Sequence, residues 1–191
     1  MSRLFEASRP VFHQLATEGL STHGYFPFRS EQAIGAPEPD PKSYLEFVPG
    51  RGLAEPLMSS AADVHGRLLS VLRGQTGVIA RGVAPMYAED LAALLVRAPP
   101  PILRITHYPG DRGREIANHP HTDIDLVTLL PRATAPGLQV ASDDRWQEIQ
   151  IDEESIIVLA GEMLELMGGA AAEVHRVVGV EASRRRCHLN W

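Results

Sequence analysis

The stretch NHPHTDIDLVTLLP, residues 118–131, places the metal-capable side chains of His119, His121 and Asp123 directly before an apolar run. In an extended strand, residues two apart project to the same face about 6.5 Å from each other, so His121 and Asp123 would grip one ion from one face. The run that follows, DLVTLL, has the length and composition of a buried strand. This stretch therefore predicts β structure with a candidate metal-binding pair at one end.

Similar apolar runs recur through the second half of the chain. They are separated by Gly, Pro and Asp clusters at about the 8–12-residue spacing of an all-β sandwich or barrel. The runs are ILRITHY, DLVTLL, GLQVAS, WQEIQI, SIIVLAG, EVHRVVGV and RCHLNW. Residues 101–191 are therefore expected to form an antiparallel β unit.

The first half of the chain, residues 1–100, has mainly helical periodicity. Apolar residues follow helical spacing from Leu4 to Leu15, with a bend or restart at Pro10, and again over Leu57–Leu72 and Met86–Ala98. Residues 22–52 are dense in Pro and Gly with interleaved aromatic residues, which predicts an ordered loop packed by its own rings. We expect a single α+β domain over residues 1–191.

Composition excludes several functional classes. The formal net charge of −6 and the pI of about 5.7 provide no positive field for a nucleic-acid backbone, and the arginine run 184–186 is too short to reverse this. Cys187 is the only cysteine, which fits a reducing compartment. The sequence has no signal peptide and no apolar run of about 20 residues. We expect a cytoplasmic protein whose partners are neither nucleic acid nor membrane.

A third candidate ligand lies in AEVHRVV, where His175 is flanked by valines on a predicted strand. Two histidines and one carboxylate form the facial triad of non-haem Fe(II) oxygenases, which leaves three metal positions open. A 2-oxo acid chelates through two oxygens and O₂ takes the third position. The arginines 184–186 follow about ten residues later, and a guanidinium holds a carboxylate through two parallel hydrogen bonds.

Several motifs, taken in order, resemble those of the isopenicillin N synthase-like family of 2-oxoglutarate/Fe(II)-dependent dioxygenases. GYFPF with PDPKSYLEF resembles that family's Gly-Tyr-x-Pro loop and Pro-Asp-x-Lys segment, and LRITHYP resembles its L-R-x-N-x-Y-P strand. HTD resembles the segment that carries that family's first two metal ligands, and HRV resembles the segment that carries the last one. RRC lies near the position of the family's R-x-S motif. The resemblance runs from about Gly24 to Trp191. It implies a double-stranded β-helix, or jelly-roll, core preceded by supporting helices.

The resemblance also implies the site. His121, Asp123 and His175 would be the iron ligands, with 2-oxoglutarate and O₂ as co-substrates of a C–H oxidation on a small molecule. The residues that would bind 2-oxoglutarate are Tyr108, Thr106, Arg185 and Cys187, with Arg184 paired with Arg186 as the alternative register. Thr106, Glu162 and Cys187 stand where the family has asparagine, aspartate and serine, and the ends of the chain are short for the family.

Three other interpretations stay open on the sequence. Gly113 followed by His119 and His121 imitates the G-x5-H-x-H opening of cupins, which would make His119, His121 and His175 the ligands of Zn²⁺ or Mn²⁺. A non-catalytic or truncated jelly roll that only binds a ligand is a second interpretation. An oxidase that uses no 2-oxo acid is a third. Substrate identity and oligomeric state are not indicated by the sequence.

Overall fold

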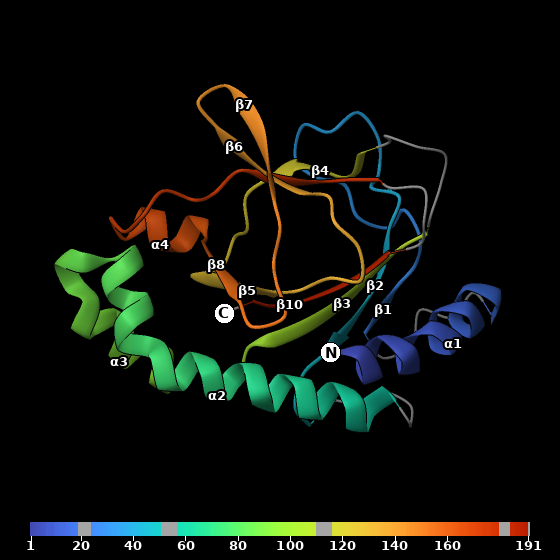
Figure 1. The fold of residues 1–191 in the computed structure, drawn as a ribbon, viewed down its shortest axis with the longest axis horizontal. Coiled ribbons are helices and arrows are strands. Elements are labelled where there is room, and N and C mark those ends of the chain that lie inside the picture. Colours follow the sequence, from blue (N-terminus) through green and yellow to red (C-terminus); the bar gives the residue numbers. More distant parts are fainter. Residues whose placement is uncertain (19–23, 51–56, 110–115, 180–183, 191) are drawn as a thin grey trace.

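The computed structural model describes residues 1–18, 24–50, 57–109, 116–179 and 184–190. The helical elements are α1 (Ser2–Glu18), α2 (Leu57–Val83), the 3-10 helix η1 (Pro85–Tyr87), α3 (Ala88–Arg97) and α4 (Glu162–Leu166). The strands are β1 (Tyr25–Phe26), β2 (Ser43–Phe47), β3 (Ile102–Tyr108), β4 (Ile116–His121), β5 (Val127–Pro131), β6 (Leu138–Ser142), β7 (Arg145–Ile149), β8 (Ile156–Ala160), β9 (His175–Val178) and β10 (Arg184–Asn190). All of the helical elements except α4 precede β3, which is the first of the eight strands described in the second half (Figure 1).

The strands form two antiparallel sheets. The large sheet has the order β1-β2-β3-β10-β5-β8 and the small sheet has the order β4-β9-β6-β7. Apart from the β6–β7 hairpin, successive strands of the second half alternate between the two sheets, which is the connectivity of a jelly roll. Each of the seven apolar runs predicted to be strands contains one. The expected α+β fold, a jelly roll preceded by supporting helices, is confirmed.

The N-terminal helices cover the outer face of the large sheet (Figure 1). Helix residues such as Leu68 and Leu91 share one buried cluster with Leu103 and Ile105 of β3. His65 of α2 bonds through Nε2 to the carbonyl oxygen of Pro101, 2.9 Å away, and so joins α2 to the start of the β unit. Within the described residues, no helix is both long and apolar enough to cross a membrane.

Two smaller apolar clusters fill the space between the sheets. Tyr108 of β3 packs with Ala117 of β4 and Val177 of β9 near one end. Leu130, Leu138 and Leu159 pack together on β5, β6 and β8. Each cluster joins strands of both sheets, so the two sheets pack face to face.

The Pro- and Gly-rich segment is more than the loop that its composition predicts. It contributes β1 and β2, and β2 pairs with β3 from Ser43↔His107 to Phe47↔Leu103. Gly24 permits the entry into β1, because its φ is +87° and a Cβ there would lie 2.6 Å from the carbonyl oxygen of Glu46. The large sheet therefore draws strands from both halves of the chain.

The structure also corrects the expectation that His121 and Asp123 lie on one extended strand. Strand β4 ends at His121, and Asp123 lies in the turn that leads to β5. This turn packs on Gly161, the residue before α4, whose N–H donates to the carbonyl oxygen of Leu126 at 3.0 Å. A Cβ at Gly161 would lie 2.0 Å from the carbonyl oxygen of Asp125.

The close approach at Gly161 generates a stability prediction. Gly161→Ala forces the turn between β4 and β5 away from α4, and we expect a loss of about 1–3 kcal/mol in the free energy of unfolding. Gly66→Ala is the matched control, because Gly66 is exposed in α2 and its Cβ would meet no atom within 4 Å. That change should stabilise by about 0.5–1 kcal/mol. Urea unfolding of both variants measures the pair, and equal effects would contradict the packing argument.

Candidate metal centre

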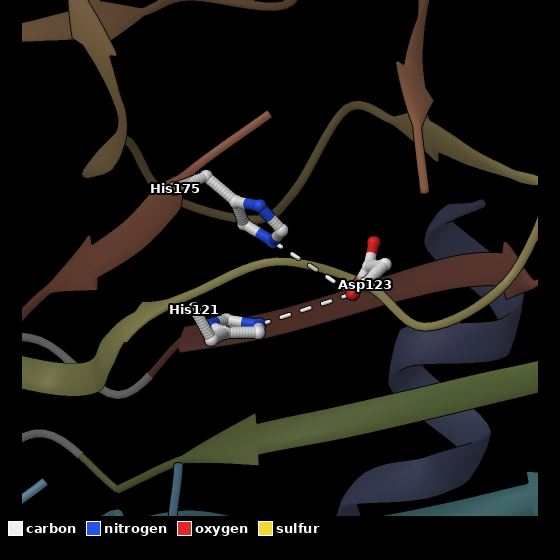
Figure 2. A group of neighbouring side chains, drawn as sticks. All are labelled: His121, Asp123 and His175. Atoms are coloured by element: carbon white, nitrogen blue, oxygen red, sulfur yellow. Dashed lines mark ion pairs between the residues drawn. The ribbon is translucent and has the colours of Figure 1, made fainter. Parts of the chain in front are cut away.

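Three side chains from two separate regions of the chain converge at the end of the small sheet. Figure 2 shows His121 and His175 directed at the carboxylate of Asp123. The Nε2 atoms of His121 and His175 lie 3.9 Å and 4.0 Å from Asp123 Oδ1. One potential ligand atom from each residue lies within 4.8 Å of the others. Ligand atoms about 2.1 Å from one ion and at right angles to each other are about 3.0 Å apart, so these three atoms would close in by about 1 Å on one ion.

Strand pairing brings the two histidines together. His121 is the last residue of β4 and His175 the first residue of β9, and the two are direct cross-strand partners. On its other side His175 pairs with Val140 of β6, so its backbone is held between two neighbouring strands. The ring centroids of His121 and His175 lie 4.3 Å apart. The site therefore depends on one backbone register, not on chain proximity.

Hydrogen bonds to backbone carbonyls fix the tautomer of both rings. Nδ1 of His121 lies 2.7 Å from the carbonyl oxygen of His119, and Nδ1 of His175 lies 3.0 Å from that of Glu173. Because a carbonyl oxygen only accepts, each Nδ1 carries the proton. Each Nε2 then presents a lone pair toward Asp123, as metal-binding histidines commonly do.

The orientation of Asp123 is set by Thr128 on β5. The buried Thr128 hydroxyl donates to Asp123 Oδ2 at 2.5 Å, which leaves Oδ1 toward the histidines. Asp125 Oδ2 lies 2.8 Å from the same hydroxyl and also accepts from Asn190 Nδ2 at 2.9 Å. A hydroxyl has one proton, so the Asn190 amide supplies Asp125 with a donor while Thr128 serves Asp123.

Asp123 and the preceding Thr122 are both tied to the start of α4. The Glu162 N–H donates to the carbonyl oxygen of Asp123 at 2.8 Å, and the Glu162 carboxylate accepts a hydrogen bond from the Thr122 hydroxyl. Glu162, which stands where the family has aspartate, therefore holds the turn that carries the carboxylate ligand. Its longer side chain reaches Thr122 without loss of the backbone contact.

The surroundings of His121 favour its neutral form. Burial lowers the pKa of His121, and the neighbouring His175 lowers it further. A neutral imidazole is the form that binds metal. Two imidazole nitrogens and one carboxylate oxygen, which form the only such cluster found among the described residues, match the donor set of a non-haem Fe(II) centre.

The geometry disfavours the cupin ligand set. His119 Nδ1 bonds to Asp40 Oδ1 at 2.7 Å, and the clustered ligand atoms in the described part of the chain include Asp123 instead of His119. Gly113 lies outside the described residues.

The residues expected to bind 2-oxoglutarate are placed in part. Thr106 and Tyr108 are buried on β3, and Tyr108 faces the space between the sheets with Ala117 and Val177. The side chains of Arg185 and Cys187 lie outside the described residues, although the β10 backbone is placed. In its register with β3, Arg184 is opposite Tyr108 and Arg185 is opposite His107.

Sequence reasoning missed the polar residues that surround the ligands. Asp40 and Lys42 enter it only as part of a family-like segment, and Asn118 and Thr128 have no predicted role. Lys42 Nζ bonds to Asn118 Oδ1 at 2.7 Å and forms an ion pair with Asp40 at 3.2 Å. A lysine and an aspartate in a predicted loop are normally expected to be exposed to solvent. The family-like PDPK motif is therefore the one sequence signal that could have pointed to Asp40 and Lys42.

Comparison with known proteins agrees with the geometry. Flavonol synthase 1 of Crocosmia x crocosmiiflora is 30% identical over 133 residues, which are 68% of this chain and 37% of that protein. A protein of Shewanella oneidensis described as a candidate oxygenase has a TM-score of 0.76 at 26% identity, over 99% of this chain and 76% of that one. A Neurospora crassa protein, solved with alpha-KG and thymine, has a TM-score of 0.75 at 21% identity, over 99% of this chain and 71% of that one.

The similarity covers only part of each curated relative. The chain spans about a third of the length of the first curated relatives that it matches. The family model described as the 2OG-Fe(II) oxygenase superfamily matches residues 99–190, which include strands β3 to β10 and with them His121, Asp123 and His175. Through this β unit the chain belongs to the 2OG-Fe(II) oxygenase superfamily.

Proposed function

We propose that this protein is a non-haem Fe(II)/2-oxoglutarate-dependent oxygenase that hydroxylates or otherwise oxidises a C–H bond of a small molecule. The observation that carries the proposal is the convergence of His121 Nε2, His175 Nε2 and Asp123 Oδ1 at one end of the jelly roll. The single cysteine supports a reducing, cytoplasmic setting.

The chain's own residues would hold and orient the reactants. His121, His175 and Asp123 would bind Fe(II) on one side and leave three positions open. Bound Fe(II) supplies the redox chemistry by which substrate R–H, O₂ and 2-oxoglutarate give R–OH, succinate and CO₂. The apolar contact of Tyr108 with Ala117 and Val177 would limit water in the space between the sheets.

The co-substrate would lie along β3 and β10. Thr106 and Tyr108 present polar groups from β3, and an arginine of β10 would hold the distal carboxylate. We propose Arg185 for this role with Cys187 beside it, as the resemblance implies. The backbone register, which sets Arg184 opposite Tyr108, supports Arg184 as the alternative to be tested.

A small molecule is the proposed class of substrate. The Neurospora crassa protein whose fold this chain shares was solved with thymine bound. A binding jelly roll without catalysis would not require two matched imidazole tautomers and a carboxylate held by Thr128, so the oxygenase proposal has the stronger support. An oxidase without a 2-oxo acid would share the same metal centre.

The first prediction from the proposed function concerns the three metal ligands. His121→Ala, Asp123→Ala and His175→Ala should each abolish stoichiometric Fe(II) binding, because two remaining ligands hold the ion too weakly. Anaerobic Fe(II) titration with metal analysis measures this, and His13→Ala on the exposed face of α1 is the control. Retention of metal by Asp123→Ala together with its loss from His119→Ala would favour the cupin ligand set instead.

The second prediction concerns the co-substrate. Anaerobic addition of 2-oxoglutarate to the Fe(II)-loaded protein should give the weak visible charge-transfer band of a chelated 2-oxo acid. Arg185→Ala should weaken 2-oxoglutarate binding and leave Fe(II) binding intact, because a guanidinium contacts only the distal carboxylate. Arg184→Ala is the matched comparison, and the stronger effect there would assign the clamp to Arg184. Metal binding without the band would favour an oxidase.

The third prediction tests the support of Asp123. Thr128→Val keeps the shape of the side chain but removes the donor to Asp123 Oδ2, and we expect Fe(II) affinity to fall about 10–100-fold. Thr128→Ser keeps the hydroxyl and should bind Fe(II) close to wild type. Equal affinities for the valine and serine variants would show that this hydrogen bond does not orient the ligand.

A further inference from the structure

Lys42 is a buried cation with two routes to one metal ligand. It lies between β1 and β2, and its side chain is 6% exposed. The ammonium group contacts Glu31 Oε2 at 2.7 Å, Asp40 Oδ2 at 3.2 Å and Asn118 Oδ1 at 2.7 Å. Two carboxylates neutralise the cation, so its third contact, to a neutral amide on β4, is not needed for charge balance.

The first route runs through Asn118. An ammonium group has donors only, so the amide atom that faces Lys42 is the oxygen. The amide nitrogen then faces His121 Nε2 at 3.5 Å, a long contact in which N–H groups point toward the ring nitrogen. Such an arrangement suits a His121 ring whose Nε2 has a lone pair. A flipped amide would present oxygen there and favour a proton on Nε2.

The second route runs through Asp40 and His119. Asp40 Oδ1 accepts from the His119 backbone N–H at 2.8 Å and bonds to His119 Nδ1 at 2.7 Å. The His119 carbonyl oxygen in turn accepts from His121 Nδ1 at 2.7 Å. Lys42 holds the other oxygen of Asp40, so the carbonyl that fixes the His121 tautomer is anchored to the same ammonium group.

The position of β4 explains why such an anchor is needed. It is an edge strand of the small sheet, paired with β9 alone among the described residues. Its register with β9 shifts twice, between Ile116 and Asn118 and between Asn118 and His121. An irregular edge strand is held by fewer ladder hydrogen bonds, and the Asp40 carboxylate takes the place of a missing neighbour.

We propose that Lys42 is a positioning residue of the metal centre: through Asn118 and the Asp40–His119 pair it holds His121 in the tautomer whose Nε2 is free to bind the ion. This inference rests on the proposed function of the triad as a metal site. It assigns Lys42 no contact with the ion, and it depends on the hydrogen bond of Lys42 to Asn118 and on its ion pair with Asp40.

Two readouts on Lys42→Met test the proposal. Titration with Co(II), followed by its visible absorption, should give a dissociation constant about 10–100-fold above wild type. Long-range ¹H–¹⁵N NMR of the metal-free protein should show the His121 ring changing from the Nδ1–H tautomer toward the Nε2–H tautomer. A merely structural lysine would lower the melting temperature without moving the tautomer.

Arg104→Met is the matched control. Arg104 forms ion pairs with Glu31 at 3.2 Å and Glu46 at 2.8 Å, so its loss also removes a partner of Glu31. No contact joins it to β4 among those found in the described residues. Its Co(II) affinity and His121 tautomer should equal wild type. The same loss of affinity in both variants, or wild-type affinity and tautomer in Lys42→Met, would overturn the proposal.

A second variant guards against misfolding. If Lys42→Met does not fold, the double variant Lys42→Met/Glu31→Gln removes one carboxylate together with the cation and should show the same two changes. Failure of the wild-type protein itself to bind Co(II) would overturn the metal centre and this inference together. Wild-type binding with no change in either Lys42 variant would overturn only the role of Lys42.

Discussion

A site made of two imidazoles and one carboxylate requires atoms from distant parts of the chain to meet within about 4 Å, and backbone pairing is what achieves this here. His121 and His175 end and begin neighbouring strands and face each other as cross-strand partners. Because side chains alternate along a strand, a shift of one residue in this register would turn one histidine away from the other. The chemistry proposed for the protein therefore depends on the ladder between β4 and β9.

That ladder is supported from the N-terminal half of the chain. The segment between β1 and β2 supplies Asp40 and Lys42 to the free edge of β4, and β2 itself extends the large sheet beside β3. Burial acts to lower the pKa of Lys42, but attraction from Tyr108, Glu31 and Asp40 outweighs it and raises that pKa, so the cation persists inside the protein. The N-terminal half of the chain thus supplies residues that hold the metal centre in place.

The sequence predicted strands of the second half, because apolar runs bounded by Gly, Pro and Asp are local signals, and it predicted the triad from its donor set and from the family resemblance. It did not predict β1 and β2, since proline and glycine obscure a strand whose pairing partner, β3, lies far along the chain. It placed Asp123 on a strand that ends at His121, because the turn is made by contacts with Gly161 and Glu162 from a distant segment. The role of Lys42 depends on its distant contact with Asn118, and that of Thr128 depends on the turn that brings Asp123 back onto β5.

The different environments of His119 and His121 show how the irregular strand selects its ligand. In an ideal strand, two residues at this spacing share a face, which is the basis of the cupin interpretation. The register shift between Asn118 and His121 breaks that equivalence. His119 is then bound by Asp40, while His121 faces His175. The same irregularity that weakens β4 as a strand therefore determines which histidine is available to the metal, and the buried contacts of Lys42 and Asp40 offset its loss of ladder hydrogen bonds.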